Sequence, residues 1–191
     1  MKIYFHLSIE EFTNCYLIVN DTAEKKEALI IDPGKINPTM IKQIENGHYD
    51  LTTVLITHNH YNHVCGLGTL NKIYTPTVYA GDNEVLGAKP VLLRGDGELD
   101  VAGLKVEYFT VPGHTLDSIV YKIGNVLFTG DTLTSGIMGE TSSHYSRKLL
   151  QSKINEKIFS QTDETVIMPG HGPPTTVLSE KKYNLDVKYK S

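Results

Sequence analysis

The sequence has few cysteines, few arginines and no long apolar run, and each shortage excludes a class of protein. Among 191 residues, Cys15 and Cys65 are too few for a disulfide framework and indicate a reduced, cytoplasmic protein. Arg94 and Arg147 are the only arginines, so few groups can bind phosphates in a bidentate manner. No apolar segment can span a bilayer, and residues 1–20 lack the basic start and apolar core of a secretion signal. We therefore expect a cytoplasmic protein without a membrane partner.

The rest of the composition is that of an ordinary globular protein. Hydrophobic residues make up 40% and charged residues 21%, and the formal net charge is −4. This charge gives no reason to expect a nucleic-acid partner, and no added basic domain is evident. A chain of this length is enough for one domain with a sizeable core. We therefore expect residues 1–191 to form a single domain.

Hydrophobic patterning predicts a layered arrangement of strands and helices. Strands are predicted at residues 2–7, 14–19, 28–31, 51–57, 78–80, 98–101, 104–111, 118–123, 126–128 and 165–168. Helices are predicted at residues 38–46, 64–70, 144–158 and 178–185. Strands that come first, followed by helices and then by strands and helices again, favour a layered α/β sandwich over a doubly wound parallel sheet.

A cluster of three histidines stands at the end of the predicted strand 51–57. Alternate residues of an extended segment project to one side, so His58 and His60 can reach the same point. If the chain then turns into a helix, His63 approaches that point from another direction. Neutral imidazole suits zinc and iron, and such sites need three or four ligands. The cluster therefore predicts a metal site.

Three later turns share one design: a glycine follows an apolar strand and precedes a side chain that can bind a metal. These turns are Gly113-His114, Gly130-Asp131 and Gly170-His171. Glycine lets the backbone bend sharply or approach a ligand closely. Each turn alone is weak evidence, but strand ends of one sheet can converge on one edge. Together they predict that His114, Asp131 and His171 join the histidine cluster.

These motifs resemble the metallo-β-lactamase superfamily over nearly the whole chain. The resemblance is carried by His58-Asn59-His60-Tyr61-Asn62-His63 and by the three glycine turns, while Asp32-Pro33-Gly34 and the segment 169–176 resemble its small glyoxalase II-like (hydroxyacylglutathione hydrolase-like) branch. The resemblance implies a four-layer αββα sandwich with the site at one edge of the β-layers.

The resemblance also implies one or two zinc ions. His58, His60 and His114 would hold the first, and His63, His171 and an aspartate at position 62 the second, with Asp131 bridging. This chain has Asn62 instead, and a neutral amide is a poorer ligand than a carboxylate, so we expect a weakened second site. Residues 139–142 also depart from the Gly-Arg-x-Asp pattern of glyoxalase II-like relatives.

The leading functional hypothesis is hydrolysis of a small thioester or ester by metal-bound hydroxide. Asp131 would be both ligand and orienting group, and the role of Asn62 stays open. No Gly-x-Ser-x-Gly motif argues for a serine hydrolase. One alternative is a single-iron oxygenase that uses His58, His114 and Asp131, as in the persulfide dioxygenases that this arrangement resembles. Another is a metal-binding protein that has lost catalysis.

Substrate contacts are predicted at the start of the helix 144–158. Tyr145 and Lys148 are candidates to contact a substrate carboxylate or thiol carrier. From the length of the sequence we expect no C-terminal helical domain of the kind with which full-length glyoxalase II enzymes bind glutathione. The thiol part of any substrate is therefore open.

Overall fold

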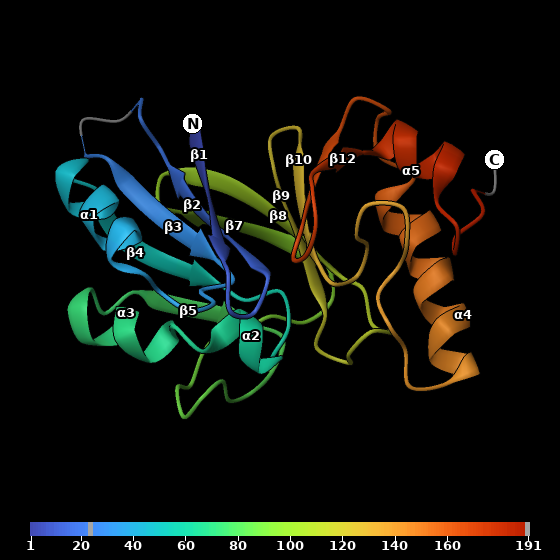
Figure 1. Ribbon diagram of the computed structural model, residues 1–191, viewed down its shortest axis with the longest axis horizontal. Coiled ribbons are helices and arrows are strands. Elements are labelled where there is room, and N and C mark those ends of the chain that lie inside the picture. Colours follow the sequence, from blue (N-terminus) through green and yellow to red (C-terminus); the bar gives the residue numbers. More distant parts are fainter. Residues whose placement is uncertain (23–24, 190–191) are drawn as a thin grey trace.

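The computed structural model describes residues 1–22 and 25–189, in which two six-stranded mixed sheets face each other (Figure 1). The first sheet has the order β1-β2-β3-β4-β5-β6. Its strands are β1 (Lys2–Ser8), β2 (Thr13–Val19), β3 (Glu27–Ile31), β4 (Asp50–Leu55), β5 (Thr77–Ala80) and β6 (Val91–Leu92). The second has the order β12-β11-β10-β9-β8-β7. Its strands are β7 (Gly97–Val101), β8 (Leu104–Thr110), β9 (Ile119–Ile123), β10 (Val126–Gly130), β11 (Val166–Pro169) and β12 (Thr175–Thr176).

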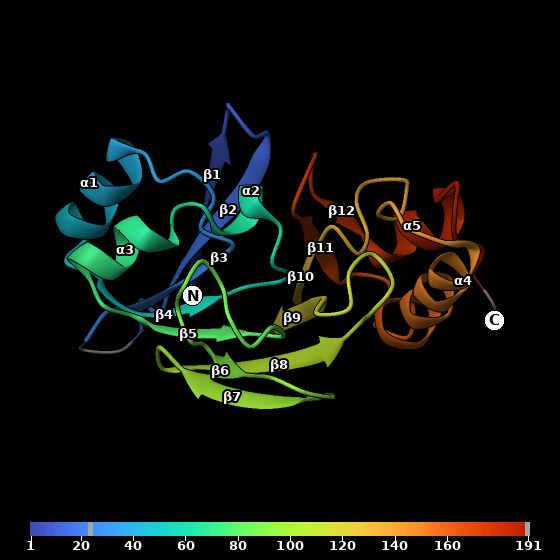
Figure 2. The same cartoon turned by 90° about the horizontal axis from the view of Figure 1, so that it is seen from below.

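Helices cover the outer faces of both sheets (Figure 2). On the first sheet these are α1 (Pro38–Asn46), α2 (Tyr61–Val64) and α3 (Leu67–Ile73). On the second they are α4 (His144–Lys153), continued by a π-helical turn over Ile154–Ile158, and α5 (Val177–Tyr183). The predicted αββα sandwich is confirmed.

Strand β2 shows how the sequence builds these layers. All seven of its residues are buried, because both faces of the strand are covered. Cys15, Leu17 and Val19 point to the helix side and belong to the outer core of the first sheet. Tyr16 and Ile18 alternate with them and belong to the core between the two sheets. The hydrophobic residues of β2 therefore form one continuous run and do not alternate with polar residues.

Most predicted elements are present, and two helices differ from prediction. The helix at residues 38–46 is α1, which the Asn37 side chain caps by accepting the Met40 N–H. The helix predicted over 64–70 is wrong, because the chain forms α2 and α3 with Gly66 between them. A Cβ at Gly66 would lie 2.1 Å from the Gly34 carbonyl oxygen, so the backbone packs against that turn. The α-helix predicted over 144–158 ends at Lys153 and continues as the π-helical turn.

The strand ends that carry the predicted ligands meet at one edge of the sandwich. Parallel pairing of β10 with β11 sets Gly130 beside Pro169, so the residues after both strands are neighbours. Strand β9 lies between β8 and β10 and is antiparallel to both, which brings the end of β8 to the same edge. The Ile119 N–H donates to the Thr57 carbonyl across 2.8 Å, which ties β4 of the first sheet to this edge.

Among the residues that the structure describes, no helix is long and apolar enough to cross a bilayer. Cys15 and Cys65 are both free thiols, Cys15 buried and Cys65 half-buried.

Candidate metal centre

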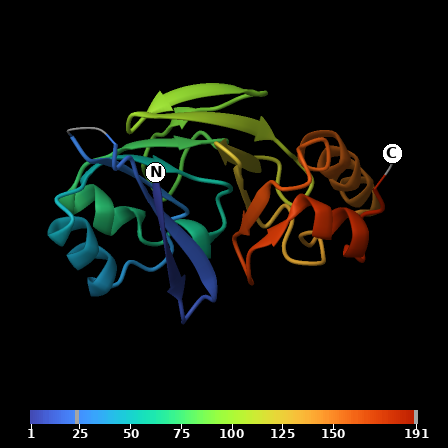
Figure 3. The same ribbon diagram turned by 90° about the horizontal axis from the view of Figure 1, so that it is seen from above.

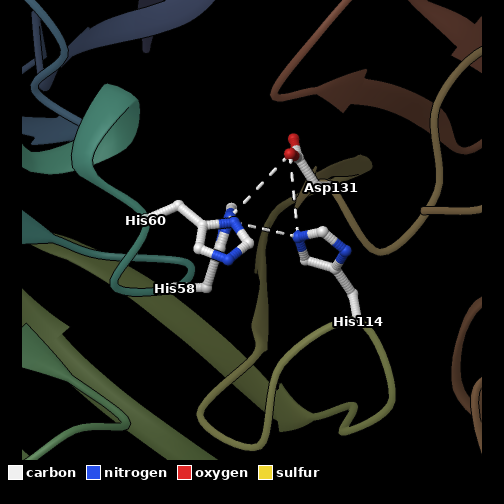
Figure 4. Close-up of side chains that lie close together, drawn as sticks. All are labelled: His58, His60, His114 and Asp131. Carbon is white, nitrogen blue, oxygen red and sulfur yellow. Dashed lines mark hydrogen bonds and ion pairs between the residues drawn. The ribbon is translucent and has the colours of Figure 1, made fainter. Parts of the chain in front are cut away.

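Three histidines from two loops converge at the shared edge (Figure 4). His58 follows β4, His60 precedes α2, and His114 lies in the turn after β8. The His60 Nδ1 lies 2.9 Å from the His58 Nε2 and 3.1 Å from the His114 Nε2. The Asp131 Oδ2 lies 3.8 Å from each of these two Nε2 atoms. These four side chains offer ligand atoms that all lie within 4.8 Å of one another.

Hydrogen bonds on the far side of the rings leave lone pairs facing the centre. The Thr57 hydroxyl donates to the Asp32 Oδ2 across 2.6 Å and therefore accepts from the His58 Nδ1–H across 3.1 Å. The His114 Nδ1–H donates to the Glu140 carbonyl across 2.7 Å. Both Nε2 atoms are thus unprotonated, as a metal ligand requires. Two nitrogens bound to one tetrahedral zinc ion lie about 3.3 Å apart, given a Zn–N distance of about 2.0–2.1 Å. The spacing of the rings therefore fits one cation.

A second cluster shares Asp131 with the first. The His63 Nε2 lies 3.3 Å from the Asp131 Oδ1, and the His171 Nε2 lies 3.5 Å from the Asp131 Oδ2. Apart from this ion pair, the buried His63 Nε2 and Asp131 Oδ1 have no hydrogen-bond partner among the described residues. Buried polar atoms are rarely left without a partner. A cation between these atoms would satisfy both.

Asn62 occupies the position where a further anionic ligand would stand. The His171 Nδ1–H donates to the Phe12 carbonyl across 2.8 Å, so its Nε2 accepts. The Asn62 Nδ2 donates to this Nε2 across 3.0 Å and to the Thr13 Oγ1 across 3.2 Å. The amide therefore occupies the lone pair of His171 that a second cation would need. A carboxylate has no proton to donate in this way.

Asp32 accepts hydrogen bonds that hold residues of both clusters in place. Its Oδ1 accepts the Thr57 N–H across 2.7 Å, and its Oδ2 accepts the His63 Nδ1–H across 2.9 Å. The residue is 2% exposed, and the backbone φ of 51° is unusual for a residue other than glycine. Such a conformation persists only where the surroundings enforce it, and here it aims His63 at Asp131.

The charges in the cluster suit cation binding. Burial and then the neighbouring His63 lower the pKa of His58 to about 2, so His58 is neutral. Burial opposes ionisation of Asp131, but His63 and His58 hold its pKa well below its usual value. Burial lowers the pKa of His63, but the Asp32 carboxylate outweighs it, and the net pKa rises to about 9. Without a cation, the proton on His63 is the positive charge between Asp32 and Asp131. Because metal ligands must be unprotonated, a bound cation would replace that proton.

Close approach explains the glycines that precede the ligands. A Cβ at Gly170 would lie 2.5 Å from the Asp131 Oδ1 and 2.6 Å from the His63 Cε1. Gly130 has a φ of +50°, and a Cβ there would lie 2.3 Å from the Thr57 Oγ1. Both positions exclude any larger residue without movement of the site.

Sequence reasoning missed two residues that hold the last turn. The Asn14 Nδ2 donates to the carbonyls of Pro169 and Gly172 across 2.9 and 2.8 Å, and the Tyr16 hydroxyl donates to Pro169 across 2.6 Å. These bonds tie β2 of the first sheet to the turn that carries His171. The available signal was a buried polar residue inside an apolar strand, because such a residue needs hydrogen-bond partners.

The centre opens into a cavity of about 350 Å³. It is lined by His60, His114, Asp131, Thr134, Ile137, Met138, Gly139, Glu140 and His171. Within the described residues, Tyr145 and Lys148 do not line this cavity. Tyr145 is 76% exposed, and Lys148 lines a separate cavity with the chain around Asp186. Their role in substrate binding stays a prediction.

Comparison with known proteins shows the family of this chain. The hydroxyacylglutathione hydrolase of Chromohalobacter salexigens is 34% identical over 159 residues, which cover 82% of this chain and 60% of that protein. The chain thus spans less than two thirds of the length of that relative. The Bacillus subtilis protein named "probable metallo-hydrolase YqgX" is 28% identical over 194 residues, covering 90% of each chain.

Among solved structures, ETHE1 from Myxococcus xanthus superposes with a TM-score of 0.89 at 30% identity. The superposition covers 100% of this chain and 86% of that one. A family profile described as the metallo-beta-lactamase superfamily matches residues 9–171, which include all the residues of both clusters. The chain therefore belongs to the metallo-beta-lactamase superfamily.

Proposed function

We propose that this protein is a metal-dependent hydrolase of a small thioester or ester. The observation that carries the proposal is that histidine lone pairs and the Asp131 carboxylate converge on a cavity, with two buried atoms that lack a hydrogen-bond partner among the described residues apart from their ion pair. Relatives named hydroxyacylglutathione hydrolase support a thioester as substrate. The free thiols of Cys15 and Cys65 agree with a reducing, cytoplasmic location.

In this proposal, His58, His60 and His114 hold the principal metal ion. Zinc, when bound, supplies Lewis-acid polarisation of an acyl carbonyl and lowers the pKa of a bound water to about 7. The Asp131 carboxylate would orient the attacking water by accepting a hydrogen bond from it, and its low pKa keeps it ionised in that role. The water oxygen bonds to the acyl carbon as one of its O–H bonds breaks, the carbon–sulfur bond breaks, and the released proton passes to the leaving thiolate.

We propose that the second cluster binds a metal more weakly than the first. His63 and His171 would hold it with the shared Asp131, and a second ion would first have to displace the Asn62 amide from the His171 Nε2. Asn62 offers that ion a neutral carbonyl oxygen instead of a charged ligand. One metal per chain is therefore the expected state.

The test combines elemental analysis with turnover. Protein stripped with a chelator and reloaded with zinc is assayed on a panel of small acyl thioesters and esters. We expect about one zinc per chain and hydrolysis that depends on reloading. His114→Ala should lose the metal, whereas His144→Ala, on the exposed start of α4, should keep it. Bound zinc without turnover of any substrate in the panel would refute the hydrolase and leave a metal-binding protein.

A single-iron oxygenase is the second candidate, because one observation favours it. His58, His114 and the Asp131 Oδ2 form a two-histidine, one-carboxylate set with equal distances of 3.8 Å from the carboxylate oxygen. Iron in the protein as purified, together with oxygen uptake on addition of a persulfide, would favour this function. Absence of oxygen uptake from the iron-loaded protein would exclude it.

A further inference from the structure

An apolar groove adjoins the metal centre on the side of His171. It has a volume of about 580 Å³ and is lined by Phe5, Leu7, Phe12, Asn14, His171, Gly172, Pro173 and Pro174. The His171 ring also lines the cavity at the metal centre, so the two cavities share one wall. The groove therefore lies directly beside the place where the proposed chemistry occurs.

The β1–β2 hairpin forms one side of the groove. Phe5 and Leu7 alternate along β1 and pair in register with Tyr16 and Asn14, so all four side chains point to the same face. Asn14 and Tyr16 bind the carbonyl of Pro169, which holds this face against the turn before β12 (Figure 3). Phe5 is 50% and Leu7 42% exposed, although both lie on a face that meets another segment. The packing of the hairpin against this turn therefore leaves the apolar groove open.

Phe12 links the groove to the metal centre. Its carbonyl accepts the His171 Nδ1–H, while its ring is 68% exposed and lines the groove. Its φ is 51°, a left-handed conformation that a phenylalanine rarely adopts. The carbonyl of Phe12 thus orients His171, a proposed metal ligand, while the apolar ring of Phe12 lines the adjoining groove.

The chemistry of the lining defines the ligand. Within residues 1–22 and 25–189, no charged side chain lines the groove, and both carbonyls bound by the Asn14 amide belong to the protein itself. A volume of this size is typical of small-molecule sites, and a continuous exposed apolar patch marks a binding surface. We propose that the groove binds the apolar acyl chain of the substrate, with the acyl carbonyl on the His171 side. This inference rests on the proposed hydrolase function.

Binding can be measured without a metal and without turnover. Metal-free, isotope-labelled protein is titrated with octanoate and, in parallel, with acetate, and amide chemical shifts are recorded. Octanoate has six more methylenes, and each buried methylene contributes up to about fourfold in affinity. We expect octanoate to bind at least tenfold more tightly, with shifts at Phe5, Leu7 and Phe12. Equal binding of the two anions, or octanoate shifts elsewhere only, would overturn the proposal.

Matched variants test whether a loss of octanoate binding comes from the groove side chains or from a disturbed fold. Phe12→Asn removes the ring but suits a left-handed backbone, and Leu7→Thr keeps strand propensity. Each should weaken octanoate at least threefold and leave acetate unchanged. Ile9→Thr is the control, because Ile9 is 76% exposed on the same hairpin but does not line this groove. An effect of Ile9→Thr as large as that of Leu7→Thr would also overturn the proposal.

Turnover of an acyl series distinguishes failure of the groove from failure of the function. Zinc-loaded protein is assayed on thioesters from acetyl to octanoyl, and kcat/KM should rise with chain length through KM. Octanoate binding without hydrolysis of any ester would refute the hydrolase while the groove stands as a site for apolar chains. Hydrolysis with equal kcat/KM for all chains would refute the groove alone. If sedimentation shows a dimer that octanoate does not disturb and Phe12→Asn dissociates, the groove holds a second copy and the proposal falls.

Discussion

Replacement of Asn62 by aspartate should act with opposite sign on the metal-free and the metal-loaded protein. In the absence of metal, Asn62→Asp removes the N–H that the Asn62 amide donates to the His171 Nε2 across 3.0 Å. It also brings a second carboxylate toward Asp131, whose Oδ2 lies 3.5 Å from the same nitrogen. His171 is 32% exposed, so water can replace part of this hydrogen bond, and its loss costs about 0.5–1.5 kcal/mol. For a chain of this size, that lowers Tm by about 1–6 °C.

With zinc present, the new charge should reverse this loss. Two unit charges about 4 Å apart attract by about 4 kcal/mol at an effective dielectric constant near 20, and desolvation of the carboxylate offsets part of it. A net gain of about 3 kcal/mol corresponds to roughly 100-fold in the dissociation constant of the second ion. The number of ions per chain should rise from about one toward two, and free zinc at about 100 times the dissociation constant should add about 2.7 kcal/mol of stability.

The assay is elemental analysis and scanning calorimetry at pH 8, with and without buffered zinc. The control is Asn46→Asp, which makes the same chemical change at an exposed position at the end of α1. Asn62→Asp should also hydrolyse thioesters faster if the second ion assists catalysis. Our account of position 62 fails if Asn62→Asp and the unchanged protein bind equal amounts of zinc and show equal Tm values in both conditions.

Two further predictions concern the support of the centre. Asp32→Asn should lower the free energy of unfolding by about 3 kcal/mol or more in urea titrations, because a buried carboxylate with three donors loses its charge while His63 stays buried. The control is Asp100→Asn at an exposed position, which should change the free energy of unfolding by less than about 0.5 kcal/mol. An equal effect of the two substitutions would contradict the role of Asp32. Gly170→Ala should reduce zinc content and cost about 1–3 kcal/mol, since its Cβ would lie 2.5 Å from the Asp131 Oδ1. Gly68→Ala, whose Cβ meets nothing within 4 Å, is the control, and full zinc binding by Gly170→Ala would show that the close approach is not required.

Local sequence patterns predicted a helix or strand well where the residues inside it and next to it determine where it begins and ends. Asn37-Pro38 and Gly47 marked both ends of α1, because capping depends on residues next to the helix. The patterns failed around Gly66, where the break between α2 and α3 comes from contact with the turn at Gly34. The two-residue strand β12 was also missed, since its pairing with β11 leaves no periodic signal. Contacts between segments far apart in the sequence decided these places.

For the candidate site, the sequence determined the kinds of ligand and their order along the chain. His58, His60, His114, Asp131 and His171 could be chosen because each follows or lies near an apolar strand end, and the structure brings them to one edge. The assignment of these residues as metal ligands stays a prediction until a metal is measured.

Only the tertiary structure decided which atom of each side chain faces the centre. The carbonyls of Phe12 and Glu140 fix two of the rings, and backbone carbonyls carry no mark in the sequence. Asp131 faces both clusters, and the Asn62 amide meets His171 across 109 positions of sequence. The sequence gives the type of side chain at each position, whereas the hydrogen-bond partners of that side chain depend on which segments the fold places side by side. The sequence alone therefore determined that a metal centre is possible, and the packing of the two sheets decided its geometry and the apolar groove beside it.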